Sequence, residues 1–237
     1  MISPRLARRI ASIHKWLGLI VGLQLLVWTG TGLFFTVFAI ADIRGDHLVR
    51  ETDDGRLDLA RVKLSVADAL AAVVEDRPAE VVLRPMGGQP VYEIRADIGV
   101  FVVSAETGTV LSLVPEDIAR RIAEARWAGE GRLEAMLFFD IAPPESGLTG
   151  PSWAAHFAGR GNPVIYVNAA NGRVGPVRTD LWRTYDFLWS LHIMDYRTRE
   201  NFNHPLIIAA AVLALTTVLF GVALVVQRFT RPKIGSG

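Results

Sequence analysis

Residues 16–41 read WLGLIVGLQLLVWTGTGLFFTVFAIA and contain no charged side chain. A second uncharged run covers residues 201–227, with an apolar core from Leu206 to Val226. A helix needs about 20 apolar residues to cross the hydrocarbon core of a bilayer, so each run is long enough to span one. The chain of 237 residues is also 51% hydrophobic, a high share for a soluble protein of this size. The sequence therefore predicts two transmembrane helices, with the lipid bilayer as a partner.

Charged residues are unevenly distributed around these runs. Four basic residues and no acidic residue precede Trp16, and three basic residues and no acidic residue follow Gln227. Residues 42–200, in contrast, hold 18 basic and 24 acidic residues, a net charge near −6. Basic flanks favour the cytoplasmic side of a membrane. We therefore expect both termini in the cytoplasm and residues 42–200 on the other side, which in a bacterial inner membrane is the periplasm.

A cleaved signal peptide is the alternative interpretation of the first run. Arg8 and Arg9 would form its basic start, and Ala39-Ile40-Ala41 matches a small-x-small cleavage site. The apolar run is about twice the usual signal-peptide core of 7–15 residues. Its length therefore favours a span that is retained in the mature protein.

Composition and motif content exclude several classes of function. The chain has no cysteine, which excludes disulfide scaffolds, thiolate metal sites and cysteine nucleophiles. A net charge of +1 argues against a general nucleic-acid binder. The spacing motifs of serine hydrolases, zinc peptidases, P-loop enzymes and dinucleotide-binding enzymes are all missing from the sequence. Histidine is therefore the residue type left with recognisable cofactor chemistry.

Small residues form a stripe on each predicted span. In the first span, Gly18 and Gly22 form a GxxxG pair on the same helical face as His14, a spacing that allows close helix approach. The second span carries its stripe at four positions: Ala210, Ala214, Thr217 and Gly221. Either the two spans pack on each other or on a second copy, or the small residues leave room for a flat cofactor.

The region between the spans contains an internal repeat. Residues 102–110, VVSAETGTV, match residues 166–174, YVNAANGRV, at an offset of 64. Each copy predicts a strand, a glycine-containing turn and a second strand, the pattern of a β-hairpin. A helix is predicted before each hairpin, one beginning at Ser65 with a capping box and one opening at Pro115. We therefore expect two similar α+β units, each a helix on a small antiparallel sheet.

The boundaries of the strands follow from the alternation of apolar residues. The expected strands are Glu80–Arg84, Val91–Arg95, Val100–Ser104, Thr109–Leu113, Leu133–Phe139, Val164–Asn168 and Arg173–Val177. The loop Ile141–Asn162 is rich in Pro, Gly and Ser, and we expect it to be the most mobile segment.

An aromatic stripe precedes the second span. Its members recur at helical spacing and are Trp182, Tyr185, Trp189, His192 and Tyr196. Trp and Tyr favour the membrane–water interface, so we expect this helix at the outer surface of the bilayer. Asn203-His204-Pro205 then predicts the start of the second span, with Pro at the first helical position. His204 is therefore interpreted as a boundary residue rather than a metal ligand.

These predictions divide the chain into seven segments. They are a basic cytoplasmic tail (1–15), a first span (16–41), two α+β units (42–114 and 115–180), an interfacial aromatic helix (181–200), a second span (201–227) and a basic cytoplasmic tail (228–237).

Two histidines carry the cofactor hypothesis. Haem b in a membrane protein is usually held by two neutral imidazoles on opposite faces of the iron. His14 lies at the cytoplasmic end of the first span and His192 on the outer side, with about 39 Å of uncharged helix between the two surfaces. The two side chains therefore cannot share one iron within a chain, but each could face its own copy in a symmetric dimer. The alternative is that both are interfacial residues.

The sequence also resembles a known family. Ile13-His14-Lys15-Trp16-Leu17-Gly18-Leu19 resembles the opening of PepSY-associated transmembrane proteins, and Leu191-His192 resembles their second histidine motif. The two hairpin turns resemble those of PepSY domains. The resemblance implies an inner-membrane protein with periplasmic PepSY modules. Some larger members of that family, with four or more spans, bind haem b and pass electrons to ferric siderophores, and His14 and His192 match the histidine positions they use.

Two hypotheses of function follow. The first is an oxidoreductase: haem b, held by His14 and His192 in a homodimer or larger membrane complex, carries electrons to a periplasmic acceptor such as a ferric chelate. His204 is a weaker candidate ligand, and Gly18 and Gly22 would make room for the haem. The second is a membrane-anchored binding or regulatory module that docks a periplasmic protein partner. A transporter subunit is a weaker third interpretation, because neither span contains a charged residue.

Overall fold

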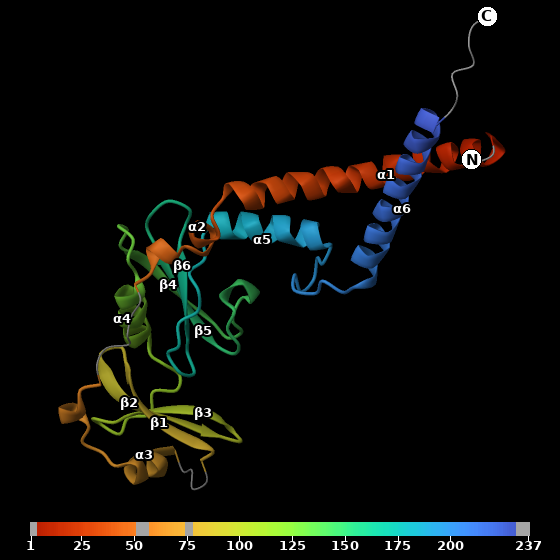
Figure 1. Cartoon of the computed structure of the whole chain (residues 1–237). Helices are drawn as coiled ribbons and strands as arrows, with labels where there is room; N and C mark the ends of the chain where they lie inside the picture. The colour runs from red at the N-terminus through yellow and green to blue at the C-terminus, as the bar shows by residue number, and fades with distance from the viewer. Residues whose placement is uncertain (1–3, 51–56, 74–77, 231–237) are drawn as a thin grey trace, which may run out of the picture. The chain divides into compact units, whose positions relative to one another are not determined.

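The computed structural model describes residues 4–50, 57–73 and 78–230 (Figure 1). Within these ranges the chain forms two compact units. One is a helical unit made from residues 1–39 together with residues 184–237, and the other is an α+β unit made from residues 40–183. Each unit is described by itself.

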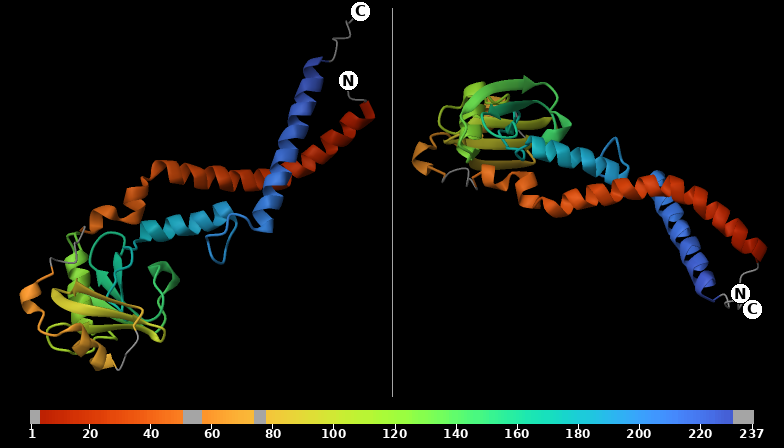
Figure 2. Two further views of the ribbon diagram at one scale, coloured as in Figure 1. Left: turned by 60° about the horizontal axis from the view of Figure 1, so that its bottom comes forward. Right: turned by 90° about the horizontal axis from the view of Figure 1, so that it is seen from above.

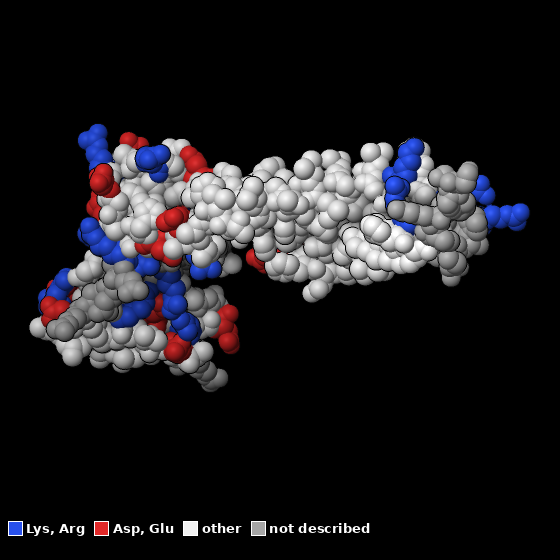
Figure 3. Space-filling model, turned by 45° about the horizontal axis from the view of Figure 1, so that its top comes forward, with Lys and Arg blue, Asp and Glu red and all other residues white. Residues whose placement is uncertain are grey.

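The helical unit contains the two long apolar helices. Helix α1 covers Pro4–Val37 and α6 covers Pro205–Thr230, and Figure 2 shows α6 crossing α1. The stretches Arg8–Val37 and Pro205–Thr230 are long and apolar enough to cross a membrane, and most of their large apolar side chains are exposed. Figure 3 shows uncharged surface along much of this unit. Both helices are therefore candidate membrane spans. Helix α1 starts 12 residues before the predicted range 16–41 and ends four residues before its end.

The small-residue stripe of α6 packs on α1, but the glycine pair Gly18 and Gly22 of α1 takes no part in this contact. The ring of His14 packs on Gly221, where an added Cβ would lie 3.1 Å from the His14 Cε1 atom. Thr217, one turn away, is buried. A Cβ added at Gly18 or Gly22, in contrast, would meet nothing within 4 Å. The two helices therefore pack through the small residues of α6 and through larger side chains of α1.

Helix α5, Asp180–Ile193, contains most of the predicted aromatic stripe. The rings of Tyr185 and Trp189 are stacked 6.0 Å apart, and those of Trp189 and His192 are stacked 6.3 Å apart. All three rings contact Phe35 of α1. The stripe is therefore a packing surface for α1 within the helical unit, and Tyr196 lies beyond the end of the helix.

The α+β unit is built from two three-stranded antiparallel sheets, as Figure 1 shows. Both sheets keep the order of the strands in the sequence. The strands are β1 (Glu80–Met86), β2 (Gln89–Ala96), β3 (Gly99–Ser104), β4 (Leu133–Phe139), β5 (Ser152–Phe157) and β6 (Val164–Asn168). Two longer helices and one short helix accompany them: α3 (Val66–Val73), α4 (Glu116–Arg126) and α2 (Ile40–Arg44).

Local signals place the two longer helices as the sequence predicts. At α3, the Ser65 hydroxyl accepts from the Asp68 amide, and the Asp68 carboxylate accepts from the Ser65 amide. This reciprocal pair is a capping box. Helix α4 begins after Pro115 and has two acidic residues in its first turn, where they oppose the positive end of the helix dipole.

The internal repeat is confirmed at the level of main-chain hydrogen bonds. The Ser104 amide donates to the Thr109 carbonyl, and 64 residues later the Asn168 amide donates to the Arg173 carbonyl. The turns are closed in the same way by the amides of Gly108 and Gly172. The predicted strands 109–113 and 173–177 are wrong, however. The return segments pair with the sheet only at isolated bridges, at Val110 in the first copy and at Val174 in the second, where the chain bridges β6 once more at Arg178.

The predicted mobile loop 141–162 is also wrong in part. Its middle forms β5, Ser152–Phe157, the central strand of the second sheet. Ala154 and Ala155 are completely buried there. Their small side chains let the strand lie between β4 and β6, but they give little apolar signal beside Gly150 and Pro151 in the sequence.

One core is shared by the two sheets and α4. Alternate residues of β2 divide between the faces of the first sheet. Val91 joins the shared core, together with Ile165 of β6 and Ile122 of α4, whereas Tyr92 joins a smaller cluster under α3. The two predicted units are therefore packed into a single body.

Glu93 is the one buried acidic residue among the described residues of this body. Its side chain is 1% exposed and accepts hydrogen bonds from Arg84, Arg95 and Arg173. Burial raises the pKa of Glu93, but the hydrogen bonds and charge of these arginines outweigh it and hold the pKa below its usual range. Because Arg173 follows the second hairpin turn, the cluster also joins the two hairpins.

Candidate functional site

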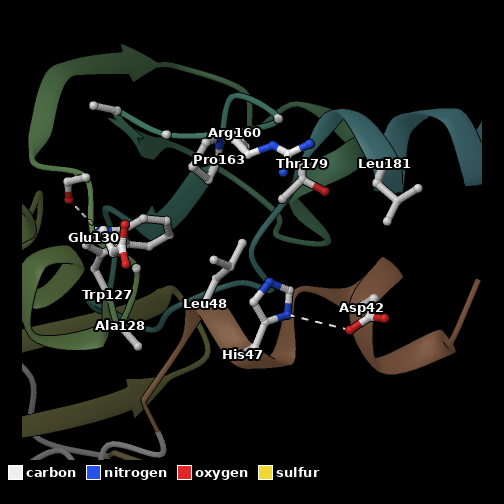
Figure 4. Close-up of a pocket in the computed structure, with 15 residues that line it drawn as sticks. Asp42, His47, Leu48, Trp127, Ala128, Glu130, Arg160, Pro163, Thr179 and Leu181 are labelled. Carbon is white, nitrogen blue, oxygen red and sulfur yellow. Dashed lines mark hydrogen bonds and ion pairs between the residues drawn. The ribbon is translucent and has the colours of Figure 1, made fainter.

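A cavity of about 650 Å³ lies in the α+β unit, at the edge of the second sheet (Figure 4). Its size is within the range of small-molecule and peptide-side-chain sites, about 300–1,000 Å³. Its walls come from α2 and the short helix that follows, from the segment after α4 and from the loop between β5 and β6. The lining side chains that are not glycine or alanine are Asp42, His47, Leu48, Trp127, Glu130, Arg160, Pro163, Thr179 and Leu181.

Two adjacent loops of similar sequence form part of the cavity wall. Residues 128–131 read AGEG and residues 158–161 read AGRG. The Ala158 amide donates to the Arg132 carbonyl across 2.8 Å, which holds the loops side by side. A Cβ added at Gly131 would lie 1.5 Å from the Ala158 carbonyl oxygen, so this approach is open only to glycine.

The floor of the cavity is aromatic. The indole of Trp127 stacks on Phe157 with ring centres 4.5 Å apart. Its ring N–H donates to the Gly131 carbonyl across 2.6 Å. A Cβ at Gly129 would lie 2.2 Å from the indole. Gly129 therefore packs on the indole and Gly131 accepts its hydrogen bond. These contacts hold the ring in place at the base of the site.

Charges of both signs surround this base. Glu130 and Arg160 are exposed at equivalent positions of the two loops. Within the described ranges neither forms an ion pair. On the other wall, His47 Nδ1 lies 4.0 Å from the Asp42 carboxylate, and both side chains are more than half exposed. Trp127 is 7% exposed, so a ligand in the cavity reaches only a small part of the indole, while Arg160 presents a positive charge suited to a carboxylate and Glu130 a negative charge suited to an amine.

Sequence reasoning missed this site. Arg160 lies in the segment 141–162 expected to be a mobile loop and Leu181 in the predicted aromatic helix, and no sequence pattern joined them to His47 or Trp127. The repeated AGxG pattern with opposite charges was the available signal. Its meaning depends on the pairing of two loops about 30 residues apart, which periodicity does not reveal.

The predicted cofactor residues lie in the helical unit, separate from this cavity. His192 Nδ1 is 2.7 Å from the Thr31 hydroxyl, and the Trp28 indole N–H donates to the His192 carbonyl across 2.7 Å. Burial lowers the pKa of His192, which favours the neutral ring. His192 is therefore held in one orientation by α1.

His14 and His204 have different surroundings. His14 packs on Gly221, and its Nδ1 atom is buried with no hydrogen-bond partner in the described part of the chain. His204 Nε2 lies 3.1 Å from the Ile193 carbonyl, and its Nδ1 accepts from the Leu206 amide. His204 Nδ1 thus caps the start of α6, and Nε2 contacts the last residue of α5. Both contacts fit a residue at a helix boundary.

The structure does not bring the two principal histidines together. Seventeen residues of α1 separate His14 from Thr31, the partner of His192, which is about 25 Å along a helix. In residues 4–50, 57–73 and 78–230 no group of three or more metal-ligating side chains is found. The separation along α1 therefore keeps His14 and His192 of one chain from sharing a single iron.

Comparison with known proteins assigns part of the α+β unit. Residues 63–114 match the family of the peptidase propeptide and YPEB domain, PepSY. The matched range contains α3 and the whole first sheet. Such a domain is extracellular or periplasmic. No curated protein and no solved structure matches the chain.

Proposed function

We propose that the chain is a membrane-anchored binding protein whose PepSY-containing unit presents a ligand site outside the cytoplasm. The cavity over Trp127, with its two oppositely charged AGxG loops, carries this proposal. The apolar helices α1 and α6 supply the anchor, in an inner membrane with both termini in the cytoplasm. The basic flanks of the two helices support that orientation.

The chemistry of the cavity favours a peptide segment of a partner protein as the ligand. Such a segment offers an apolar side chain for the indole of Trp127 and carries charges of both signs. The exposed charges of Glu130 and Arg160 would guide its approach more than they strengthen its binding. Binding should therefore weaken as the salt concentration rises.

Copurification from membranes tests this function. The full chain would be captured from detergent-solubilised membranes at low and at high salt. We expect a partner at low salt that is lost from the double charge exchange Glu130→Arg with Arg160→Glu. Arg121→Glu is the matched control, because Arg121 is exposed on α4 and paired with Asp117, away from the cavity. Retention of the partner by the exchange variant, or no partner at either salt, would contradict the proposal.

Haem-linked electron transfer is the second candidate function, and the contact between Thr31 and His192 favours it. The Thr31 hydroxyl also lies 2.8 Å from the Val27 carbonyl, to which it donates its single proton. It then accepts from Nδ1–H of His192, and Nε2 keeps its lone pair. A histidine whose Nδ1 is held by such a bond is oriented as metal-ligating histidines are.

In that candidate a second copy of the chain, or another subunit, supplies the opposite ligand. Haem bound by His192 pairs, and by His14 pairs near the other end of α1, would supply one-electron transfer toward an acceptor such as a ferric chelate. The test is a reduced-minus-oxidised spectrum of the purified protein. We expect a b-type spectrum that loses the haem of the altered pair in His192→Ala and in His14→Ala and is unchanged in His156→Ala. Haem retention in both test variants, or no haem in the unmodified protein, would refute it.

A further inference from the structure

A second cavity, of about 260 Å³, lies between α1 and α6 in the helical unit. Its walls are almost entirely apolar. On α6 the lining includes the small side chains of Ala209, Ala210 and Ala214, and on α1 it includes Val21, Gln24 and Trp28. Ile20 and Leu23, at its edge, are about two-thirds exposed. The cavity therefore opens on the surface that α1 and α6 would present to lipid.

Gln24 is the polar exception in this wall. Its Nε2 atom is buried and has no hydrogen-bond partner in the described part of the chain. Burial of an amide group in an apolar environment without a hydrogen-bond partner is unfavourable. In a bilayer core no water is present to supply the missing acceptor. The amide nitrogen of Gln24 is therefore a donor in need of a ligand.

The depth of Gln24 limits what that ligand can be. Nine residues, about 13 Å of helix, separate Gln24 from Lys15, the last charged residue before the uncharged run, and 13 residues separate it from the end of α1. The hydrocarbon core is about 30 Å thick, so Gln24 lies near its middle. The ester carbonyls of phospholipids lie at the edges of that core and do not reach this depth. At this depth the acceptor belongs either to another helix or to a neutral, lipid-soluble molecule.

We propose that this cavity binds the ring of an isoprenoid quinone, with a ring carbonyl accepting a hydrogen bond from Gln24. The volume is just below the usual range for ligand sites, about 300–1,000 Å³, and suits one substituted ring with its tail along the exposed helix surface. The small side chains of α6 make the space, and Trp28 provides an aromatic wall. The inference rests on the membrane anchoring in the proposed function and is independent of the α+β cavity.

The experiment is a titration of ubiquinone-2 into the full chain in phosphatidylcholine nanodiscs, followed by tryptophan fluorescence quenching. Ala210→Leu fills the cavity and should abolish saturable quenching. Ala211→Leu, at an exposed α6 position outside the lining, is the matched control and should leave it unchanged. Gln24→Leu keeps the bulk but removes the donor, and we expect about tenfold weaker binding, the effect of one lost hydrogen bond.

Equal quenching in Ala210→Leu and Ala211→Leu, or no saturable quenching in the unmodified protein, would overturn the proposal. A second copy covering the cavity is a further outcome to examine. The chain has no cysteine, so Gln24→Cys carries a single thiol. Efficient disulfide formation between two copies would show that a helix occupies the cavity and would overturn quinone binding. Vesicle flotation separates the levels of failure: protein that does not float contradicts the anchoring itself, and protein that floats without binding quinone contradicts this inference alone.

Discussion

The two sheets of the α+β unit end in hairpins with the same hydrogen-bond pattern, but the connections between their strands differ. In the first sheet, β1 joins β2 through Gly87-Gly88 and β2 joins β3 through Asp97-Ile98, both two-residue turns. In the second sheet the corresponding connections are residues 140–151 and residues 158–163. The cavity is lined by the second of these longer connections. The two copies therefore share a common framework of strands and turns. The longer β5–β6 connection of the second copy forms part of the cavity.

The two copies also differ in where their charges lie. Glu93 of the first sheet is buried under three arginines, one of them from the second hairpin. Glu130 and Arg160 of the second half are exposed and lie on the two adjacent loops that line the cavity. The ion pairs of Glu93 thus hold the two sheets together. Glu130 and Arg160, which form no ion pair within the described ranges, are available to a ligand. The four predictions below test this division.

Glu93→Ala should have the largest effect on stability. Removal of the carboxylate leaves the guanidinium of Arg84, which is 16% exposed, without its charge partner. Breaking a buried pair from one side costs about 3–5 kcal/mol. We expect a loss of that size in the unfolding of the α+β unit, measured by denaturant titration of the full chain in detergent. Glu116→Ala, in an exposed pair on α4, should cost less than about 1 kcal/mol, and equal losses would contradict the cohesive role.

Gly131→Ala should have the next largest effect. The added Cβ would lie 1.5 Å from the Ala158 carbonyl oxygen, so the two AGxG loops must separate. We expect a loss of about 2 kcal/mol, within the range for strained or overpacked sites, and loss of partner binding. Gly88→Ala, at a turn where the added Cβ meets nothing within 4 Å, should keep partner binding despite its positive φ. Normal binding by Gly131→Ala would show that the loop contact is unnecessary.

The acid dependence of stability should depend on Glu93. Its pKa is lowered in the folded chain, so its contribution is present above the unfolded value of about 4.3 and is lost as the pH falls through the folded value. Unfolding free energies measured between pH 6 and pH 3 should therefore decline less steeply in Glu93→Gln than in the unmodified protein. Parallel declines would show that Glu93 does not titrate as the cluster implies.

A loop exchange should have the smallest effect on stability and a large effect on binding. Residues 158–162 would be replaced by Asn-Gly, which gives the second hairpin a tight turn like that of the first. A shorter loop changes the closure cost by only about 0.6 kcal/mol per halving of its length. We expect a folded protein, by circular dichroism, that no longer binds its partner. Retained binding would place the ligand site elsewhere.

Much of this fold follows from the sequence, and the reasons are physical. The uncharged runs, the capping box at Ser65 and the 64-residue repeat are local signals, and the structure agrees with each. β5 was missed because Ala154 and Ala155 carry small side chains whose burial depends on neighbouring strands. The cavity was missed because the loops that carry Glu130 and Arg160 lie together only when β4 pairs with β5. His14 and His192 were singled out by residue type, and their role as haem ligands stays a prediction.

Thiol labelling tests the central claim most directly. Ala128→Cys would place a single thiol at the cavity, at an exposed lining position that keeps both loop charges. Ile98→Cys would place one at the first hairpin turn, where Ile98 is 76% exposed. In intact spheroplasts, a membrane-impermeant maleimide should react with both variants, and with Ala128→Cys more slowly than in the purified protein because the partner covers the cavity. Labelling only after lysis would contradict an extracytoplasmic unit. Equal rates for Ala128→Cys in spheroplasts and after purification would contradict an occupied ligand site.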